Sequence, residues 1–152
     1  MKNNKIIDIS IIVPVYFNGE SLNILFNRIK DNVIEKNLDR TFEIIFIDDG
    51  SKDKSLEVLL NLKRSYPQYI KIIKFTRNFG QVPAVTAGLR AAKGKFIISI
   101  DADLQDPPEL MHEMIEAHFT EGFEIVVGTR QVRKESLYRR AGSSLWYSIL
   151  RK

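Results

Sequence analysis

Short runs of β-branched residues alternate with longer amphipathic stretches along this chain, and that alternation limits the folds open to it. The apolar runs have the length and composition of buried strands, whereas the segments between them carry apolar residues at helical spacing. Strands are expected at 6–15, 42–47, 70–75, 96–100 and 124–127, and helices at 21–36, 56–66, 81–92 and 108–120. Continuous apolar strands separated by helices predict an α/β fold, with a mostly parallel sheet covered by helices on both faces.

Size and composition indicate one globular domain followed by a basic segment. The chain has 152 residues, of which 44% are hydrophobic and 28% charged, as is usual for a soluble domain. We expect a core at 1–130 and a separate segment at 131–152, where six basic residues accompany only Glu135. Apolar residues at helical spacing there, including Trp146, predict an amphipathic helix that is truncated at Lys152.

No apolar run reaches the roughly 20 residues that a membrane-spanning helix needs, and the first residues lack the features of a signal peptide. The chain is therefore expected to be cytoplasmic. It has no cysteine and only two histidines, His112 and His118, so a bound metal would be held mainly by oxygen atoms. The two histidines lack the spacing of a ligand pair and are given no chemical role.

Polar clusters follow directly after four of the expected strands, at 14–16, 48–51, 101–103 and 128–130. The carboxyl ends of parallel strands lie at one edge of the sheet, where ligands bind in such folds. We therefore expect the four clusters to converge. The phosphate-binding motifs of P-loop enzymes and of dinucleotide-binding domains are both absent from the sequence. A receiver domain would carry an acidic pair after its first strand, where this chain has Pro14-Val15-Tyr16, so a receiver domain fits poorly.

Two of these clusters contain paired acids, and each pair has two interpretations. Asp101 and Asp103 suit Mg²⁺ or Mn²⁺ on a bridged diphosphate, or they cap the helix that follows, for which Asp106 is the better candidate. Asp48 and Asp49 are placed to accept hydrogen bonds from a ribose or a base N–H. Alternatively, the second cluster only ends a strand, with Ser51 as the N-cap of the next helix and Asp53 in its first turn.

Five motifs in fixed order carry a resemblance to a known family. They read Ile-Ile-Val-Pro-Val-Tyr at 11–16, Ile-Asp-Asp-Gly-Ser at 47–51, Arg-Asn-Phe-Gly-Gln at 77–81, Asp-Ala-Asp-Leu-Gln-Asp-Pro-Pro-Glu at 101–109 and Gly-Thr-Arg at 128–130. Together they resemble family-2 glycosyltransferases of the polyprenyl-phosphate sugar transferase group, which includes dolichol-phosphate mannosyltransferases and bactoprenol glucosyltransferases. The resemblance implies a GT-A nucleotide-diphospho-sugar transferase fold, which is Rossmann-like.

The resemblance also implies roles for individual residues. The nucleoside would be held by Pro14, Tyr16, Asp48 and Asp49, the divalent cation by Asp101, Asp103 and Gln105, and a donor or acceptor phosphate by Arg130. Gly80, Ala102, Arg139 and Arg140 complete the expected substrate-binding set. Related chains often read Pro-x-Tyr-Asn-Glu, whereas Phe17 and Gly19 interrupt that pattern here, so either Asn18 or Glu20 takes the nucleoside-contacting role.

The activity implied is inverting transfer of a hexose from a nucleotide-diphospho-sugar, UDP-hexose being favoured, to a polyprenyl phosphate at the cytoplasmic face of a membrane. The metal would neutralise the departing diphosphate, and the anionic acceptor oxygen removes the need for a general base. Segment 131–152 would dock on an anionic membrane surface, and full-length relatives often add membrane helices. Two alternatives are a donor-binding fragment that is inactive alone and a transferase with a saccharide acceptor. No nucleic-acid partner is expected, and homo-oligomerisation stays open.

Overall fold

A computed structural model describes residues 6–129 as a four-stranded parallel sheet with helices on both faces. The strands are β1 (Ile7–Val15), β2 (Phe42–Asp48), β3 (Ile70–Lys74) and β4 (Gly94–Ser99), in the order β3-β2-β1-β4. All three strand pairs are parallel, with Ile9 opposite both Phe42 and Phe96. The α/β fold predicted from the alternation of strands and helices is confirmed.

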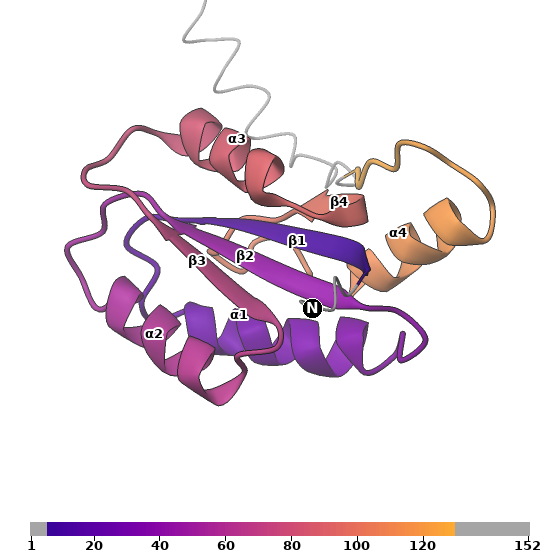
Figure 1. Cartoon of the computed structure of the whole chain (residues 1–152), viewed down its shortest axis with the longest axis horizontal. Helices are drawn as coiled ribbons and strands as arrows, with labels where there is room; N and C mark the ends of the chain where they lie inside the picture. Colours follow the sequence, from indigo (N-terminus) through magenta and orange to yellow (C-terminus); the bar gives the residue numbers. More distant parts are fainter. Residues whose placement is uncertain (1–5, 130–152) are drawn as a thin grey trace, which may run out of the picture.

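The helices divide between the two faces of the sheet, as Figure 1 shows. Helices α1 (Leu22–Ile29) and α2 (Ser55–Ser65) cover one face and α3 (Gln81–Ala91) covers the other, while α4 (Leu110–Phe119) packs against β4. A π-helical turn, η1 (Lys30–Ile34), extends α1 within the expected helix 21–36. The carboxyl ends of the strands lie at the left of Figure 1, where the connections to α1, α2 and α3 begin.

The core has two layers because β1 and β2 are buried on both faces. Ile9, Ile11 and Val13 point to the larger cluster under α1 and α2, whereas Ile12 belongs to a smaller cluster under α3. A Cβ at Gly88 would lie 2.5 Å from Ile12 Cγ2, so this glycine lets α3 approach the sheet closely. That close packing fixes the start of α3 above the carboxyl ends of the strands.

The strand predicted at 124–127 does not form. Ile125 and Val127 are 83% and 72% exposed, and β1 is the only strand that pairs with β4 within residues 6–129. A strand needs both a neighbour for its backbone hydrogen bonds and burial for one face of its side chains. This segment lies beside β4 but makes no backbone pairing with it, and only Val126 packs partly against the core. Its β-branched composition alone therefore does not make a strand.

The predicted N-cap of the second helix is also wrong. Helix α2 begins at Ser55, and the Ser51 hydroxyl instead accepts a hydrogen bond from the Phe17 backbone N–H at 3.1 Å. The N-cap position of α4 is Glu109, which makes no side-chain cap bond and pairs with Arg28 at 2.6 Å. Glu109, and not Asp101 or Asp103, occupies the N-cap position of α4, so capping of α4 does not account for these two aspartates.

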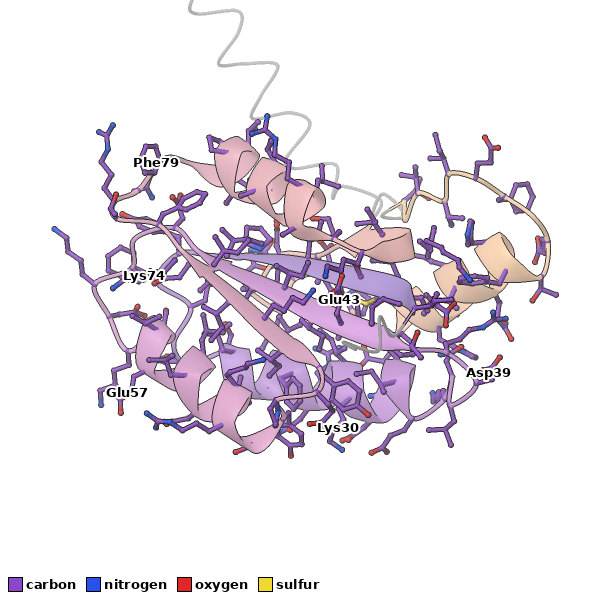
Figure 2. All side chains as sticks on the ribbon, viewed as in Figure 1. Lys30, Asp39, Glu43, Glu57, Lys74 and Phe79 are labelled. Carbon is purple, nitrogen blue, oxygen red and sulfur yellow. The ribbon has the colours of Figure 1, made fainter. Side chains whose placement is uncertain are left out.

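Glu43 is a buried carboxylate in the middle of the sheet, labelled in Figure 2. Its Oε1 accepts hydrogen bonds from the Ser10 hydroxyl at 2.6 Å and the Lys93 backbone N–H at 2.7 Å, and its Oε2 pairs with Lys71. Burial raises the pKa of Glu43, but the contacts with Lys71, Ser10 and Lys93 outweigh it and hold that pKa below its ordinary value. The charged form is therefore the one that the fold stabilises.

Replacing Glu43 with glutamine is expected to lower the free energy of unfolding at pH 7 by about 2 kcal/mol, because a buried charged acceptor is lost. Since the pKa of Glu43 is lowered by folding, its contribution is complete above the unfolded pKa and disappears as pH falls through the folded one. Urea denaturation at several pH values should show a shallower acid loss for Glu43→Gln than for wild type. Glu57→Gln, on the exposed side of α2, is the control. Equal acid losses in Glu43→Gln and wild type would contradict this role.

Candidate functional site

A pocket of about 250 Å³ lies at the carboxyl ends of the strands, between the end of β1, the start of α3 and the loop after β4. It brings together eight of the residues predicted from the sequence: Pro14, Tyr16, Asn18, Asp49, Gly80, Asp101, Ala102 and Asp103. Four lining residues were not nominated: Val15, Asn78, Gln81 and Ala84. Three of the four predicted polar clusters therefore meet in one cavity.

The remaining predicted residues lie elsewhere. Glu20 and Gln105 are exposed and do not line the pocket, and Asp48 is fully buried. Arg130, Arg139 and Arg140 lie outside the described residues. Of the cluster at 128–130, the two described residues do not join this pocket, because Gly128 and Thr129 line a separate cavity of about 620 Å³ between β4 and α4. Because residues 124–127 do not form a strand of the sheet, Gly128 and Thr129 do not lie at the carboxyl ends of the strands that line the pocket.

Asp49 joins the end of β2 to the start of α3. Its Oδ1 accepts a hydrogen bond from the Phe79 backbone N–H at 2.7 Å and its Oδ2 accepts one from Gly80 N–H at 2.8 Å. The neighbouring Gly50 has a φ of 72°, and a Cβ there would lie 2.7 Å from the Asn78 backbone nitrogen. The glycine thus admits the loop before α3. The motifs at 47–51 and 77–81 form one packed unit.

Asp48 has a different environment, although it is adjacent in sequence. Its Oδ1 accepts a hydrogen bond from the Ser51 backbone N–H at 3.0 Å, whereas its Oδ2 is buried with no hydrogen-bond donor among residues 6–129. Buried acceptors are nearly always satisfied in folded proteins. The second oxygen is therefore an unmet acceptor beside the ligand-binding edge of the sheet.

The loop between β1 and α1 is held by side chains of its own and of α2. Asn18 Oδ1 accepts a hydrogen bond from Tyr16 N–H at 2.8 Å, and Asn18 N–H donates to the Ser55 hydroxyl at 2.9 Å. Asp53 accepts a hydrogen bond from Gly19 N–H at 3.1 Å. Burial raises the pKa of Asp53, but hydrogen bonds from Ser55 and Gly19 outweigh it and lower that pKa. Of the two alternatives in this loop, Asn18 faces the pocket and Glu20 does not.

Each acid of the Asp-x-Asp motif has one oxygen engaged and one available. Asp101 Oδ1 accepts a hydrogen bond from Gln81 Nε2 at 2.8 Å, and Asp103 Oδ1 accepts one from Gln105 N–H at 3.0 Å. No residue within 6–129 donates to the Oδ2 of either aspartate. The Ser21 hydroxyl donates to the Ala102 carbonyl oxygen at 2.5 Å and so tethers this loop to α1.

Two available carboxylate oxygens fit Mg²⁺ or Mn²⁺, which bind through one or two carboxylates and complete their coordination with water and substrate phosphates. No group of three or more His, Cys, Asp or Glu side chains within residues 6–129 is arranged to hold a metal ion. The donor set therefore suits a cation that arrives with a phosphorylated ligand. His112 contacts Asn37 and His118 stacks on Phe96, which are packing roles.

Two polar residues of the pocket lining were not predicted from the sequence: Asn78, in the loop before α3, and Gln81. Gln81 begins α3 directly after Gly80, and a polar side chain at a helix start is ordinarily solvated. The available signal was its position, because the helix that follows β3 must begin at the same sheet edge as the Asp-x-Asp motif.

Among the described residues, no helix is both long and apolar enough to cross a lipid bilayer.

Comparisons with curated proteins give relatives that are themselves transferases. A Bacillus subtilis (strain 168) protein described as uncharacterized glycosyltransferase YkcC is 41% identical over 145 residues, covering 95% of this chain and 44% of the relative. The undecaprenyl-phosphate 4-deoxy-4-formamido-L-arabinose transferase of Photorhabdus laumondii is 34% identical over 152 residues, covering all of this chain and 46% of the relative. The chain thus spans less than half the length of these relatives.

Solved structures of low sequence identity share the fold. Staphylococcus aureus TarS 1-349 matches 86% of this chain and 40% of its own, with a TM-score of 0.62 and 21% identity. The mannosyltransferase PcManGT from Pyrobaculum calidifontis, in complex with GDP-Man and Mn²⁺, matches 65% of this chain and 32% of its own, with a TM-score of 0.54 and 21% identity. These likenesses confirm the predicted GT-A fold.

The family assignment rests on the whole chain rather than on one motif. Residues 10–152 match the family described as glycosyl transferase family 2. Relatives of more than 30% identity cover nearly all of the sequence, and the pocket gathers residues of four of the five motifs that carried the resemblance. The chain belongs to glycosyl transferase family 2.

Proposed function

We propose that this chain carries the donor site of an inverting transferase that moves a hexose from a nucleotide-diphospho-sugar, with UDP-hexose favoured, to a polyprenyl phosphate. The observation that carries the proposal is the pocket in which Tyr16, Asp49, Asp101 and Asp103 meet. The relative that acts on undecaprenyl phosphate supports the acceptor class, and the structural neighbour with GDP-Man and Mn²⁺ supports a nucleotide-sugar and a divalent cation.

The nucleoside end of the donor is assigned to the β1 and β2 side of the pocket. Pro14, Tyr16 and Asn18 line that side. Asp48 was expected to contact the nucleoside as well, but its side chain is fully buried and does not line the pocket. Asp49 acts differently from what its sequence position suggested, because both of its oxygens already accept backbone hydrogen bonds. In this proposal Asp49 shapes the nucleoside site through the loop that it holds.

The diphosphate end is assigned to Asp101 and Asp103, whose Oδ2 atoms would hold Mg²⁺ or Mn²⁺. A bound cation would supply positive charge against the charge that develops on the departing diphosphate. Gln105 was expected to be a third ligand, but its exposed side chain lies away from the pocket lining. Two carboxylates and the donor phosphates remain as the proposed ligand set.

Transfer is proposed as a single displacement. An anionic oxygen of the lipid phosphate bonds to the anomeric carbon as the bond from that carbon to the diphosphate oxygen breaks. Because the attacking oxygen is already charged, the site needs to position and stabilise rather than remove a proton. Arg130 is proposed to contact a donor or acceptor phosphate. The basic residues of 131–152, among them Arg139 and Arg140, are proposed to attract an anionic membrane surface.

The direct test of this function is transfer of radiolabelled hexose from UDP-hexose to undecaprenyl phosphate in anionic vesicles. A chain that includes the remaining length of its relatives is expected to form labelled lipid. The 152-residue chain is expected to bind UDP and to transfer less, because it spans under half of those relatives. Label appearing only on an added saccharide acceptor would contradict the lipid-phosphate acceptor.

Asp103→Asn is expected to remove most of the Mn²⁺-dependent gain in UDP affinity, since it deletes one of two proposed charged ligands. The change should be about tenfold or more. Calorimetry with Mn²⁺ and with EDTA measures it, and Glu113→Gln on the exposed side of α4 is the matched control. Equal UDP affinity with Mn²⁺ and EDTA in wild type would rule out the metal assignment.

Asp49→Ala is expected to weaken UDP binding and also to destabilise the fold by roughly 2–3 kcal/mol, because two charge-assisted hydrogen bonds to backbone amides are lost. Thermal melting and UDP titration, both at a temperature where the variant is folded, separate the two effects. Unchanged stability with weaker UDP binding would instead make Asp49 a direct ligand.

A further inference from the structure

We propose that Gln81 is a positioning residue for Asp101, and that Asp49 in turn fixes Gln81, so that the nucleoside and diphosphate halves of the site form one hydrogen-bonded unit. The inference rests on the proposed function, because it takes Asp101 to be a ligand of the donor-bound cation. It adds Gln81 to the site and couples the nucleoside half to the diphosphate half, neither of which binding of the nucleotide-sugar by itself requires.

The first link is the bond between two side chains that lie far apart in the sequence. Gln81 is the first residue of α3, and its Nε2 donates to Asp101 Oδ1 at 2.8 Å. Both residues line the pocket. The bond fixes the rotation of the Asp101 carboxylate and leaves its Oδ2 without a donor among residues 6–129. One oxygen is therefore held in place while the other stays available to a cation.

The second link fixes the position from which Gln81 donates. Phe79 and Gly80, the two residues before it, bind the Asp49 carboxylate through their backbone N–H groups at 2.7 and 2.8 Å. Asp49 is itself 4% exposed at the end of β2. The start of α3 cannot move away from the sheet without breaking both bonds, so the Gln81 side chain begins from a fixed backbone.

The neutral amide group of Gln81 supports a positioning role. A lysine or arginine at position 81 would also bind the Asp101 carboxylate, but its positive charge would repel an incoming cation. An amide N–H is a neutral donor, so it orients the carboxylate and leaves its negative charge in the site. Hydrogen-bond partners of this kind around metal ligands typically change metal affinity by tenfold or more when they are removed.

The test is Gln81→Met, which keeps the side chain's length and removes its donor. Mn²⁺ affinity is measured by the loss of the free-ion electron paramagnetic resonance signal in the presence of UDP, and UDP affinity is measured by calorimetry in EDTA. We expect Mn²⁺ to bind about tenfold more weakly, with UDP affinity in EDTA and the melting temperature unchanged. Val82→Ala, at the next position of α3 where the side chain is 76% exposed, is the control and should match wild type.

A second variant pair tests whether the effect passes through Asp101. In an Asp101→Asn background, adding Gln81→Met should cause no further loss of Mn²⁺ affinity, because the carboxylate that it orients is gone. Additive losses, or an equal loss of UDP affinity in EDTA, would overturn the positioning role. Normal Mn²⁺ binding by Gln81→Met would overturn the positioning role and leave the proposed metal site standing. If the wild-type chain binds no Mn²⁺ with UDP or GDP, both the positioning role and the proposed metal site are overturned.

Discussion

The two hydrogen bonds that Asp49 accepts from Phe79 and Gly80 are the contacts on which the site depends. A parallel sheet brings strand ends to one edge, but it does not by itself fix the loops that leave them. Asp49 converts the end of β2 into an anchor for the start of α3. Gly50 allows these hydrogen bonds to form, because a Cβ at this position would collide with the backbone at 77–78. Through this anchor, a buried strand determines where an exposed amide side chain lies.

The sequence is informative wherever local pattern and burial agree. The runs that became β1 and β2 are continuously apolar because helices bury these central strands on both faces, so their composition predicts parallel strands inside the sheet. The pocket follows from the same rule, since Tyr16, Asp49 and Asp101 all come directly after strands. For this part of the molecule, one-dimensional spacing contains enough information to place residues in space.

The predictions fail where a distant contact decides the local structure. Ser51 looks like a helix cap, yet it bonds to Phe17 from another loop. The segment 124–127 has strand composition and lies beside β4, yet it makes no backbone pairing with β4 among the described residues. Gln81 looks like a solvated helix start, and only the fold places it beside Asp101. For Ser51 and Gln81 the deciding partner lies at least twenty positions away in the sequence, beyond the reach of periodicity and capping rules.

The position of β1 in the sheet has a consequence for synthesis of the protein. It is the first strand of the chain but lies inside the sheet, between β2 and β4. After β2, the chain forms one more strand and two more helices before it reaches β4. A nascent chain can therefore form the β1–β2–β3 ladder while the other side of β1 still has no partner. During that interval the unpaired backbone N–H and C=O groups at Ile9–Ile12, which later pair with Phe96–Ser99, are open to mispairing. Folding of this domain on the ribosome is complete only after β4 emerges, a non-local step of the kind that slows folding.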